Sequence, residues 1–328
     1  MGMILSAVES PIWVPWPRLP RGGPDTCKPR PPSTTLAGHG ERSGGTADDR
    51  ARRGCEGDAM GLPGPTRTCY GVVHLAPLPG TPFYEPDSLR HTLARAVESA
   101  RALDRGGAHG CLLQTADRVY GVEDDCDPAR LAAVTVITEA VRAATDPAFQ
   151  VGVQIMRNAT RASLAAAKVC GGSFVRVGAI VGETLSWQGT VRPDPAAVMA
   201  YRRAIDAWDV RVIADVASMH FSWPNGEKQP GEVARSAMNA GADAVCLGDP
   251  DESRTLELIS QVRRAAPAAP IYLAGHTDHD NAARLVGAAD GVFVGSCVTV
   301  GGWAGDVSEQ KVRSYMDILD SLPHRETA

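Results

Sequence analysis

The sequence predicts a (β/α)8 barrel of the TIM-barrel class, preceded by an N-terminal extension that is not part of the barrel. Three observations support this: eight short apolar runs, helix-like segments between them, and glycines where those segments end. Eight strand–helix units over about 250 residues is the size of this barrel class. Near-continuous apolar strands also fit a parallel sheet that is buried on both faces.

The expected strands follow one another at regular intervals from residue 71 onward. They are GVVHL (71–75), GCLLQ (110–114), VGVQIM (151–156), FVRVG (174–178), VRVIAD (210–215), DAVCLG (243–248), IYLAG (271–275) and GVFVG (291–295). The segments between them, such as 87–107 and 252–266, carry alanine, leucine and arginine at helical spacing. Glycine then marks the helix ends in RGGAHG, VCGGSF and NAGADA. An open doubly wound sheet is the alternative, but no G-x-G-x-x-G follows the first strand.

Residues 1–66 differ from the rest in composition. They are rich in proline, glycine, arginine, serine and threonine and lack a hydrophobic period, so we expect a disordered extension before a barrel at 67–328. The first ten residues lack the basic start and sustained apolar centre of a secretory signal. The sequence leaves open whether translation starts at Met1 or Met60.

Composition excludes several classes of function. The net charge of −5 gives no basic footprint for nucleic acid, and no apolar run approaches the roughly 20 residues that span a membrane. The eight cysteines form no C-x-x-C pair, which favours a cytoplasmic protein with reduced thiols. We expect a small-molecule partner and no cofactor. A homo-oligomer is left open.

Candidate acid/base residues lie at strand ends, where active sites of such barrels are built. His74 closes the first strand, Asp215 closes the fifth, and His220 follows in the next loop. Histidine titrates near neutrality and a carboxylate can orient it, so these three are the predicted catalytic groups. The alternative is a hydrogen-bonded core histidine at 74, a loop-capping Asp215 and an exposed His220.

Candidate binding residues occupy four other strand ends. Arg157 and Asn158 suit a carboxylate or phosphate oxygen, or else a structural salt bridge across the barrel mouth. Arg176 lies within the fourth strand and needs either Asp215 or a ligand anion as its partner. Gly275 and the Gly295-Ser296 pair suit phosphate, or only allow tight turns.

Two further chemistries are weighed from residue placement. The motif GHTDHD (275–280), which contains His276, suggests a metal site only weakly, because the same residues also fit a helix cap. We therefore predict no metal. Schiff-base aldolases need a lysine at the barrel mouth. None of the four lysines lies at a predicted strand end, so this reaction is disfavoured; they are Lys28, Lys168, Lys228 and Lys311.

Taken in order, six motifs resemble the BtpA/SgcQ family from Gly71 to about Asp317. They are GVVHLAPLPG, IMRNAT, FVRVGAI, WQG, VIADVASMH and ADGVFVG. The resemblance implies a barrel and a site at these motifs. It also implies kinship with a factor linked to photosystem I accumulation and with members encoded in sugar-uptake or antibiotic biosynthetic gene clusters.

The chain departs from the family pattern at positions that are usually charged. Gln114-Thr115 replaces Glu-Asn, Ala159 replaces an acidic residue, and Met219 and a residue near Thr299 replace lysines. The family's Gly-Ser-Gly after the seventh strand is Ala-Gly-His here. Either the substrate has changed or the family's reaction has been lost.

We therefore expect a barrel that binds a small phosphorylated or sugar-like metabolite and acts on it by acid/base chemistry, as an isomerase, lyase or glycosyl-cleaving enzyme. A non-catalytic biogenesis or assembly factor of the photosystem I type is the alternative. The expected substrate-binding residues are Gln114, Arg157, Asn158, Arg176, Gly275, His276, Gly295 and Ser296.

Overall fold

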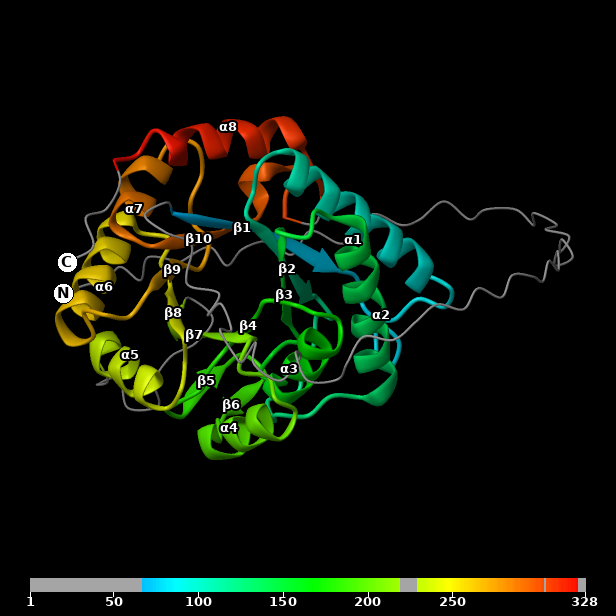
Figure 1. Cartoon of the computed structure of the whole chain (residues 1–328). Helices are drawn as coiled ribbons and strands as arrows, with labels where there is room; N and C mark the ends of the chain where they lie inside the picture. The colour runs from blue at the N-terminus through cyan, green and yellow to red at the C-terminus, as the bar shows by residue number, and fades with distance from the viewer. Residues whose placement is uncertain (1–66, 219–228, 304, 324–328) are drawn as a thin grey trace, which may run out of the picture. The chain divides into compact units, whose positions relative to one another are not determined.

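The structure is a computed structural model, and it describes residues 67–218, 229–303 and 305–323 (Figure 1). Within these residues, eight parallel strands close into a barrel in the order β1-β10-β9-β8-β7-β4-β3-β2, which confirms the predicted fold. The barrel strands are β1 (Thr68–Leu75), β2 (Gly110–Thr115), β3 (Gln150–Gln154), β4 (Phe174–Val177), β7 (Arg211–Ala217), β8 (Ala244–Leu247), β9 (Ile271–Leu273) and β10 (Gly291–Val294).

Helices follow the strands and form an outer ring around the barrel (Figure 1). In the described ranges they are α1 (Leu89–Arg105), α2 (Pro128–Ala144), α3 (Thr160–Val169), α4 (Pro195–Ala204), α5 (Pro230–Asn239), α6 (Glu252–Ala265), α7 (Ala282–Ala288) and α8 (Glu309–Asp320). The predicted disordered extension 1–66 and the catalytic candidate His220 lie outside the described residues, and so does Met60, the alternative start that the sequence leaves open.

Local signals set the helix boundaries. The carboxylate of Asp127 accepts a hydrogen bond from the Ala129 amide at 2.8 Å, and Pro128 takes the first helical position of α2. Glycines with positive φ follow α1, α3 and α5, as the sequence predicted: Gly107 (87°), Gly171 (65°) and Gly241 (100°).

Two antiparallel hairpins extend loops of the barrel, and neither was predicted. Strands β5 (Thr184–Ser186) and β6 (Gly189–Val191) pair after β4, and β11 (Thr299–Val300) and β12 (Asp306–Val307) pair after β10. A 3-10 turn, η1 (Ser296–Val298), precedes β11. Because both hairpins follow the carboxyl ends of barrel strands, they belong to the loops on that side of the barrel.

Aromatic rings fill the barrel interior toward the amino ends of the strands. Tyr70, Phe174, Tyr272 and Phe293 are buried, and the centroids of their contacting ring pairs lie 4.3 to 6.0 Å apart. The Tyr70 hydroxyl donates to Gln150 Oε1 at 2.7 Å. The interior is packed at this level, so a ligand site must lie nearer the carboxyl ends.

The barrel closes where its first strand meets its last. β1 and β10 pair in parallel, with Thr68 opposite Gly291. Next to this seam the buried Arg67 donates hydrogen bonds to three carbonyl oxygens: Val286 at 3.0 Å, Pro323 at 2.8 Å and Gly287 at 3.1 Å. Arg67 therefore ties the start of β1 to α7 and to the segment after α8.

Candidate functional site

Polar side chains occupy inward-facing positions at the carboxyl ends of five barrel strands. Alternate residues of a strand face the same side, so the inward phase of Tyr70 continues through Val72 to His74. Both Val72 and His74 keep part of their surface accessible, so the barrel is open above its aromatic rings. We call the following five side chains the polar layer: His74, Gln114, Gln154, Arg176 and Asp215.

An ion pair links two members of the polar layer. Arg176 donates to the Asp215 carboxylate at 2.9 Å from Nε and 3.1 Å from Nη2, and the two side chains are only 10% and 6% exposed. This confirms the predicted pairing of Arg176 with Asp215. Burial by itself would lower the pKa of the guanidinium, but the adjacent carboxylate raises it above its usual value. The guanidinium carbon lies 5.1 Å from the ring centroid of Phe293, so Arg176 reaches from β4 toward β10.

His74 lies on β1 with its ring edge-on to Trp303, at a centroid distance of 4.9 Å. Its Nδ1 atom is fully enclosed and has no hydrogen-bond partner among the described residues. Burial lowers the pKa of His74 to about 4, although hydrogen bonding to Trp303 and Gln114 favours the protonated form. The imidazole is therefore neutral at pH 7.

Gln114 joins His74 to the next strand. It lies beside His74 in register, and its Nε2 donates to Oε1 of Gln154 at 2.6 Å. Sequence reasoning missed Gln154, as well as Cys246, which lies beside Asp215 in register on β8. Each is a polar or polarizable residue at an inward position of an otherwise apolar strand, and this is the signal that could have found them. Burial raises the pKa of the Cys246 thiol, which disfavours a nucleophilic role.

Arg157 and Asn158 lie in the loop after β3. The Arg157 guanidinium carbon lies 4.9 Å from the ring centroid of Tyr120, and burial lowers the pKa of this arginine. Asn158 is 4% exposed, and its Oδ1 accepts a hydrogen bond from the Ala179 amide at 3.0 Å. Asn158 thus braces the loop after β4, and its substrate-binding role remains a prediction.

The predicted phosphate-binding residues lie after β9 and β10. Gly275 has a φ of 102°, and no heavy atom lies within 4 Å of the position that a Cβ would take. A Cβ on Gly295 would lie 3.8 Å from His74 Cε1, so this glycine adjoins the polar layer. His276 and Ser296 are exposed beside them. The glycines therefore leave open space on the β9–β10 side of the mouth.

Metal binding and Schiff-base formation depend on where the possible ligands and the lysines lie. In residues 67–218, 229–303 and 305–323, no three His, Cys, Asp or Glu side chains are grouped so that they could hold a metal ion. Of the two described lysines, Lys168 pairs with Asp209 at 2.8 Å. Lys311 donates to the Thr299 carbonyl at 2.7 Å and thus reaches the loop after β10 from α8. Lys28, Lys228 and Met219 lie outside the described ranges.

An eight-stranded parallel barrel with polar side chains at the carboxyl ends of its strands defines a TIM-barrel protein with its candidate site at the barrel mouth. The model of the BtpA family matches residues 66–321, and the chain belongs to this family. No helix in the described ranges has the length and apolar character needed to cross a membrane.

Curated relatives support the family assignment. Photosystem I biogenesis protein BtpA of Synechocystis sp. is 30% identical over 232 residues, which cover 69% of this chain and 78% of the relative. An uncharacterized protein of Archaeoglobus fulgidus is 31% identical over 244 residues, covering 72% and 93%. Among solved structures, Mycobacterium tuberculosis tryptophan synthase matches with a TM-score of 0.50 and 16% identity, covering 80% and 94%. That last likeness concerns the fold alone.

Proposed function

We propose that the barrel mouth binds a small phosphorylated or sugar-like metabolite and acts on it by acid/base chemistry, as an isomerase, lyase or glycosyl-cleaving enzyme. The observation that carries this proposal is His74. The residue keeps part of its surface accessible, its Cε1 adjoins Gly295 at the mouth, and its pKa of about 4 leaves the ring neutral at pH 7. A neutral imidazole that faces a solvent-accessible mouth can accept a proton from a bound substrate.

The Arg176–Asp215 pair would assist that proton transfer. When a substrate loses a proton to His74, negative charge develops on an adjacent oxygen, and a fixed cation stabilises it. Arg176 is such a cation, because two hydrogen bonds to Asp215 hold its guanidinium in place. The proposal therefore assigns proton transfer to His74, charge stabilisation to Arg176, and the positioning of Arg176 to Asp215.

A phosphate group, where the substrate carries one, would bind on the β9–β10 side. Gly275 and Gly295 present backbone without side chains there, and exposed backbone amides suit an anion. Since Gly295 adjoins His74, a small metabolite anchored at the glycines would place its reacting end near the imidazole. The proposal includes a cytosolic location, supported by the six free cysteines in the described ranges.

The test begins with a thermal-shift panel of sugar phosphates and nucleotides, since a ligand at 100 times its Kd stabilises a protein by about 2.7 kcal/mol. For a binder, proton NMR in D2O then measures exchange or conversion. His74→Asn should lower the rate by about 10²–10⁴-fold. Asp215→Asn should lower the rate more than the affinity, because it keeps shape while removing charge.

His109→Asn is the matched control. His109 is also half-buried with a pKa lowered by burial, but it accepts a hydrogen bond from the Cys69 amide at the other end of the barrel. This variant should react at the wild-type rate. A panel without any binder would contradict the proposal, and so would equal losses in the His74 and His109 variants.

A second candidate function is a non-catalytic biogenesis or assembly role. The name of the Synechocystis relative favours it. So do Gln114 and Ala159, which are neutral where the resemblance to the family implies acidic residues. Thr115, which replaces the family's asparagine, accepts hydrogen bonds from Arg130 at 2.8 Å and from the Met156 amide at 3.0 Å, which is a bracing role. Photosynthesis genes beside the coding gene would support this alternative. Sugar-uptake or biosynthetic genes of the SgcQ kind would support the enzyme.

A further inference from the structure

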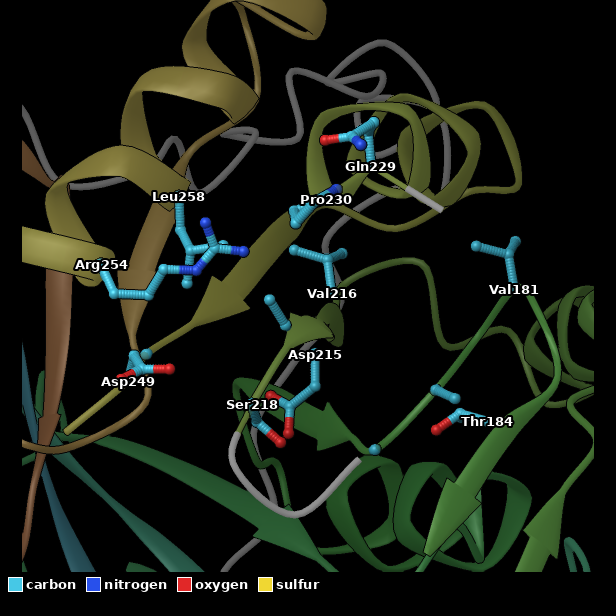
Figure 2. Close-up of a pocket in the computed structure, with 14 residues that line it drawn as sticks. Val181, Thr184, Asp215, Val216, Ser218, Gln229, Pro230, Asp249, Arg254 and Leu258 are labelled. Carbon is cyan, nitrogen blue, oxygen red and sulfur yellow. The ribbon is translucent and has the colours of Figure 1, made fainter. Parts of the chain in front are cut away.

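A cavity of about 230 Å³ lies beside the polar layer, between the ends of β4, β7 and β8. Figure 2 shows its lining, with Asp215 and Ser218 from β7 and the residue after it, Thr184 from β5, and Asp249 and Arg254 from beyond β8. Val216 and Leu258 are buried and form part of its wall. Exposed residues, including Gln229 and Arg254, lie at its edge and connect it to solvent.

Two hydroxyl groups in this lining have no hydrogen-bond partner among the described residues. Thr184 is only 3% exposed, yet its Oγ1 is enclosed and unpaired. The enclosed Oγ of Ser218 is also unpaired. Enclosed hydroxyls are costly when they stay unpaired, and nearly all of those in folded proteins bond to protein, water or ligand. Both hydroxyls therefore belong to residues that line the cavity and have no hydrogen-bond partner in the described ranges.

The backbone of β7 is irregular beside the same cavity. Side chains of a regular strand alternate between two faces, and a register shift changes which of them face a neighbouring cavity. Here the register with β8 shifts between Asp215 and Ala217, and the four consecutive residues 215–218 all line the cavity. Such bulges re-aim side chains, and they are frequent beside active sites.

The charges at the cavity favour an uncharged ligand. Arg176 already pairs with Asp215, and Arg254 pairs with Glu257 at 2.5 Å. Asp249 adds a further carboxylate, so the lining offers no surplus positive charge for a phosphate. Carboxylates and hydroxyls together accept from and donate to the hydroxyl groups of a ligand. The volume is far above the 10–15 Å³ that one water needs, and it is below the roughly 300–1,000 Å³ of drug-sized pockets.

We infer that this cavity is a subsite for an uncharged, hydroxyl-rich group of about the size of one monosaccharide, recognised by Thr184 Oγ1, Ser218 Oγ and the Asp249 carboxylate. The inference extends the proposed function by naming a subsite for the substrate. It rests on the proposed function only for the reaction that the bound substrate undergoes. A substrate would then lie across the mouth, with its hydroxyl-bearing part in the cavity and any phosphate at the glycines.

The experiment measures the binding of unphosphorylated probes to the full chain. D-ribose, D-xylose and myo-inositol are titrated at millimolar concentrations and followed by saturation-transfer NMR. Thr184→Val keeps the shape and removes the unpaired hydroxyl, so it should weaken the best probe three- to tenfold without lowering the melting temperature. Ser218→Ala should act in the same direction. Thr190→Val, on the same hairpin but outside the lining, should bind like the wild type.

Three outcomes overturn the subsite: no probe binds, the probes bind Thr184→Val as tightly as the wild type, or inorganic phosphate competes with them for the same site. Failure of the subsite is separable from failure of the proposed function. If sugar phosphates are turned over while unphosphorylated probes do not bind, only the subsite fails. If the probes bind in a Thr184-dependent manner and His74→Asn changes no reaction, the subsite stands and the acid/base proposal fails.

Discussion

The charge state of His74 follows from its surroundings. Its Nδ1 is enclosed and has no partner in the part of the chain that the structure describes, and the ring packs edge-on to Trp303. Arg176 adds a positive charge nearby that opposes protonation. Burial is the largest of these influences on the pKa. The folded protein therefore keeps neutral an imidazole that the unfolded chain would protonate near pH 6.5.

This difference predicts how stability depends on pH. The folded pKa of about 4 is below the unfolded value of 6.5, so between these values the unfolded chain binds the extra proton. The free energy of unfolding therefore has its full value above pH 6.5 as far as His74 is concerned. It falls as the pH drops toward 4, by at most about 3 kcal/mol. Urea unfolding of wild type and His74→Asn at pH 7.0, 5.5 and 4.5 should show the wild type losing more. A constant difference between the two proteins would contradict the assigned pKa.

Residue placement shows how far the sequence could predict the site. His74 and Asp215 could be predicted because the apolar pattern indicates where the strands end. Arg176 could be predicted because a cation inside an apolar strand needs a partner. Gln154 was not predicted, because it lies within the apolar run VGVQIM and only the apolar residues of that run indicate a strand. Thr184 could not be found, because its unpaired hydroxyl follows from a cavity between segments far apart in the sequence.

Two glycines, one in the loop after β9 and one in helix α7, differ in what they need from the backbone. Gly275 follows β9 with a φ of 102°, a conformation that side chains of L-residues rarely adopt. Gly287 lies inside α7 without a positive φ, and like Gly275 it has no heavy atom within 4 Å of a built Cβ. The two positions thus differ in conformation and not in available space.

Alanine substitutions separate these effects. Gly275→Ala should lower the free energy of unfolding by about 1–2 kcal/mol, since strain is its only new cost. Gly287→Ala should raise it by about 0.5–1 kcal/mol, because alanine favours a helix interior over glycine. Urea unfolding measures both. A stabilised Gly275→Ala variant would show that the loop after β9 does not require its left-handed conformation.

The sequence predicts the barrel strands and several helix ends, but it does not predict the two hairpins. All eight barrel strands could be predicted because each is a buried apolar run, and three helix ends because glycine follows them. The hairpins β5–β6 and β11–β12 have strands of only two or three residues with mixed burial, so they carry no detectable period. Their pairing depends on the loops from which they extend.

Arg67 joins the start of β1 to α7 and to the segment after α8. Its three hydrogen bonds end on carbonyls of α7 and of the segment after α8. Arg67→Ala should therefore lower the free energy of unfolding by about 2–3 kcal/mol, since it leaves three carbonyls without this donor.

Deleting residues 1–60 should leave the melting temperature nearly unchanged, because their composition does not favour packing.

Scanning calorimetry of the two variants tests this contrast. Arg101→Ala serves as the control, since Arg101 forms only an exposed pair with Glu98, worth less than about 1 kcal/mol. A large drop on deletion would mean that residues 1–60 pack against the barrel. Equal effects of the two arginine substitutions would mean that the barrel seam does not depend on Arg67.

The pairing of the first barrel strand with the last also has a consequence during protein synthesis. Arg67 and its partner Pro323 are 256 residues apart, so a ribosome adding about 5–20 residues per second needs roughly 13–50 s to make one after the other. Until β10 emerges, the nascent chain holds β1 with one edge unpaired, a template for pairing with a neighbouring chain. Chaperone demand should thus be greatest just before β10 emerges.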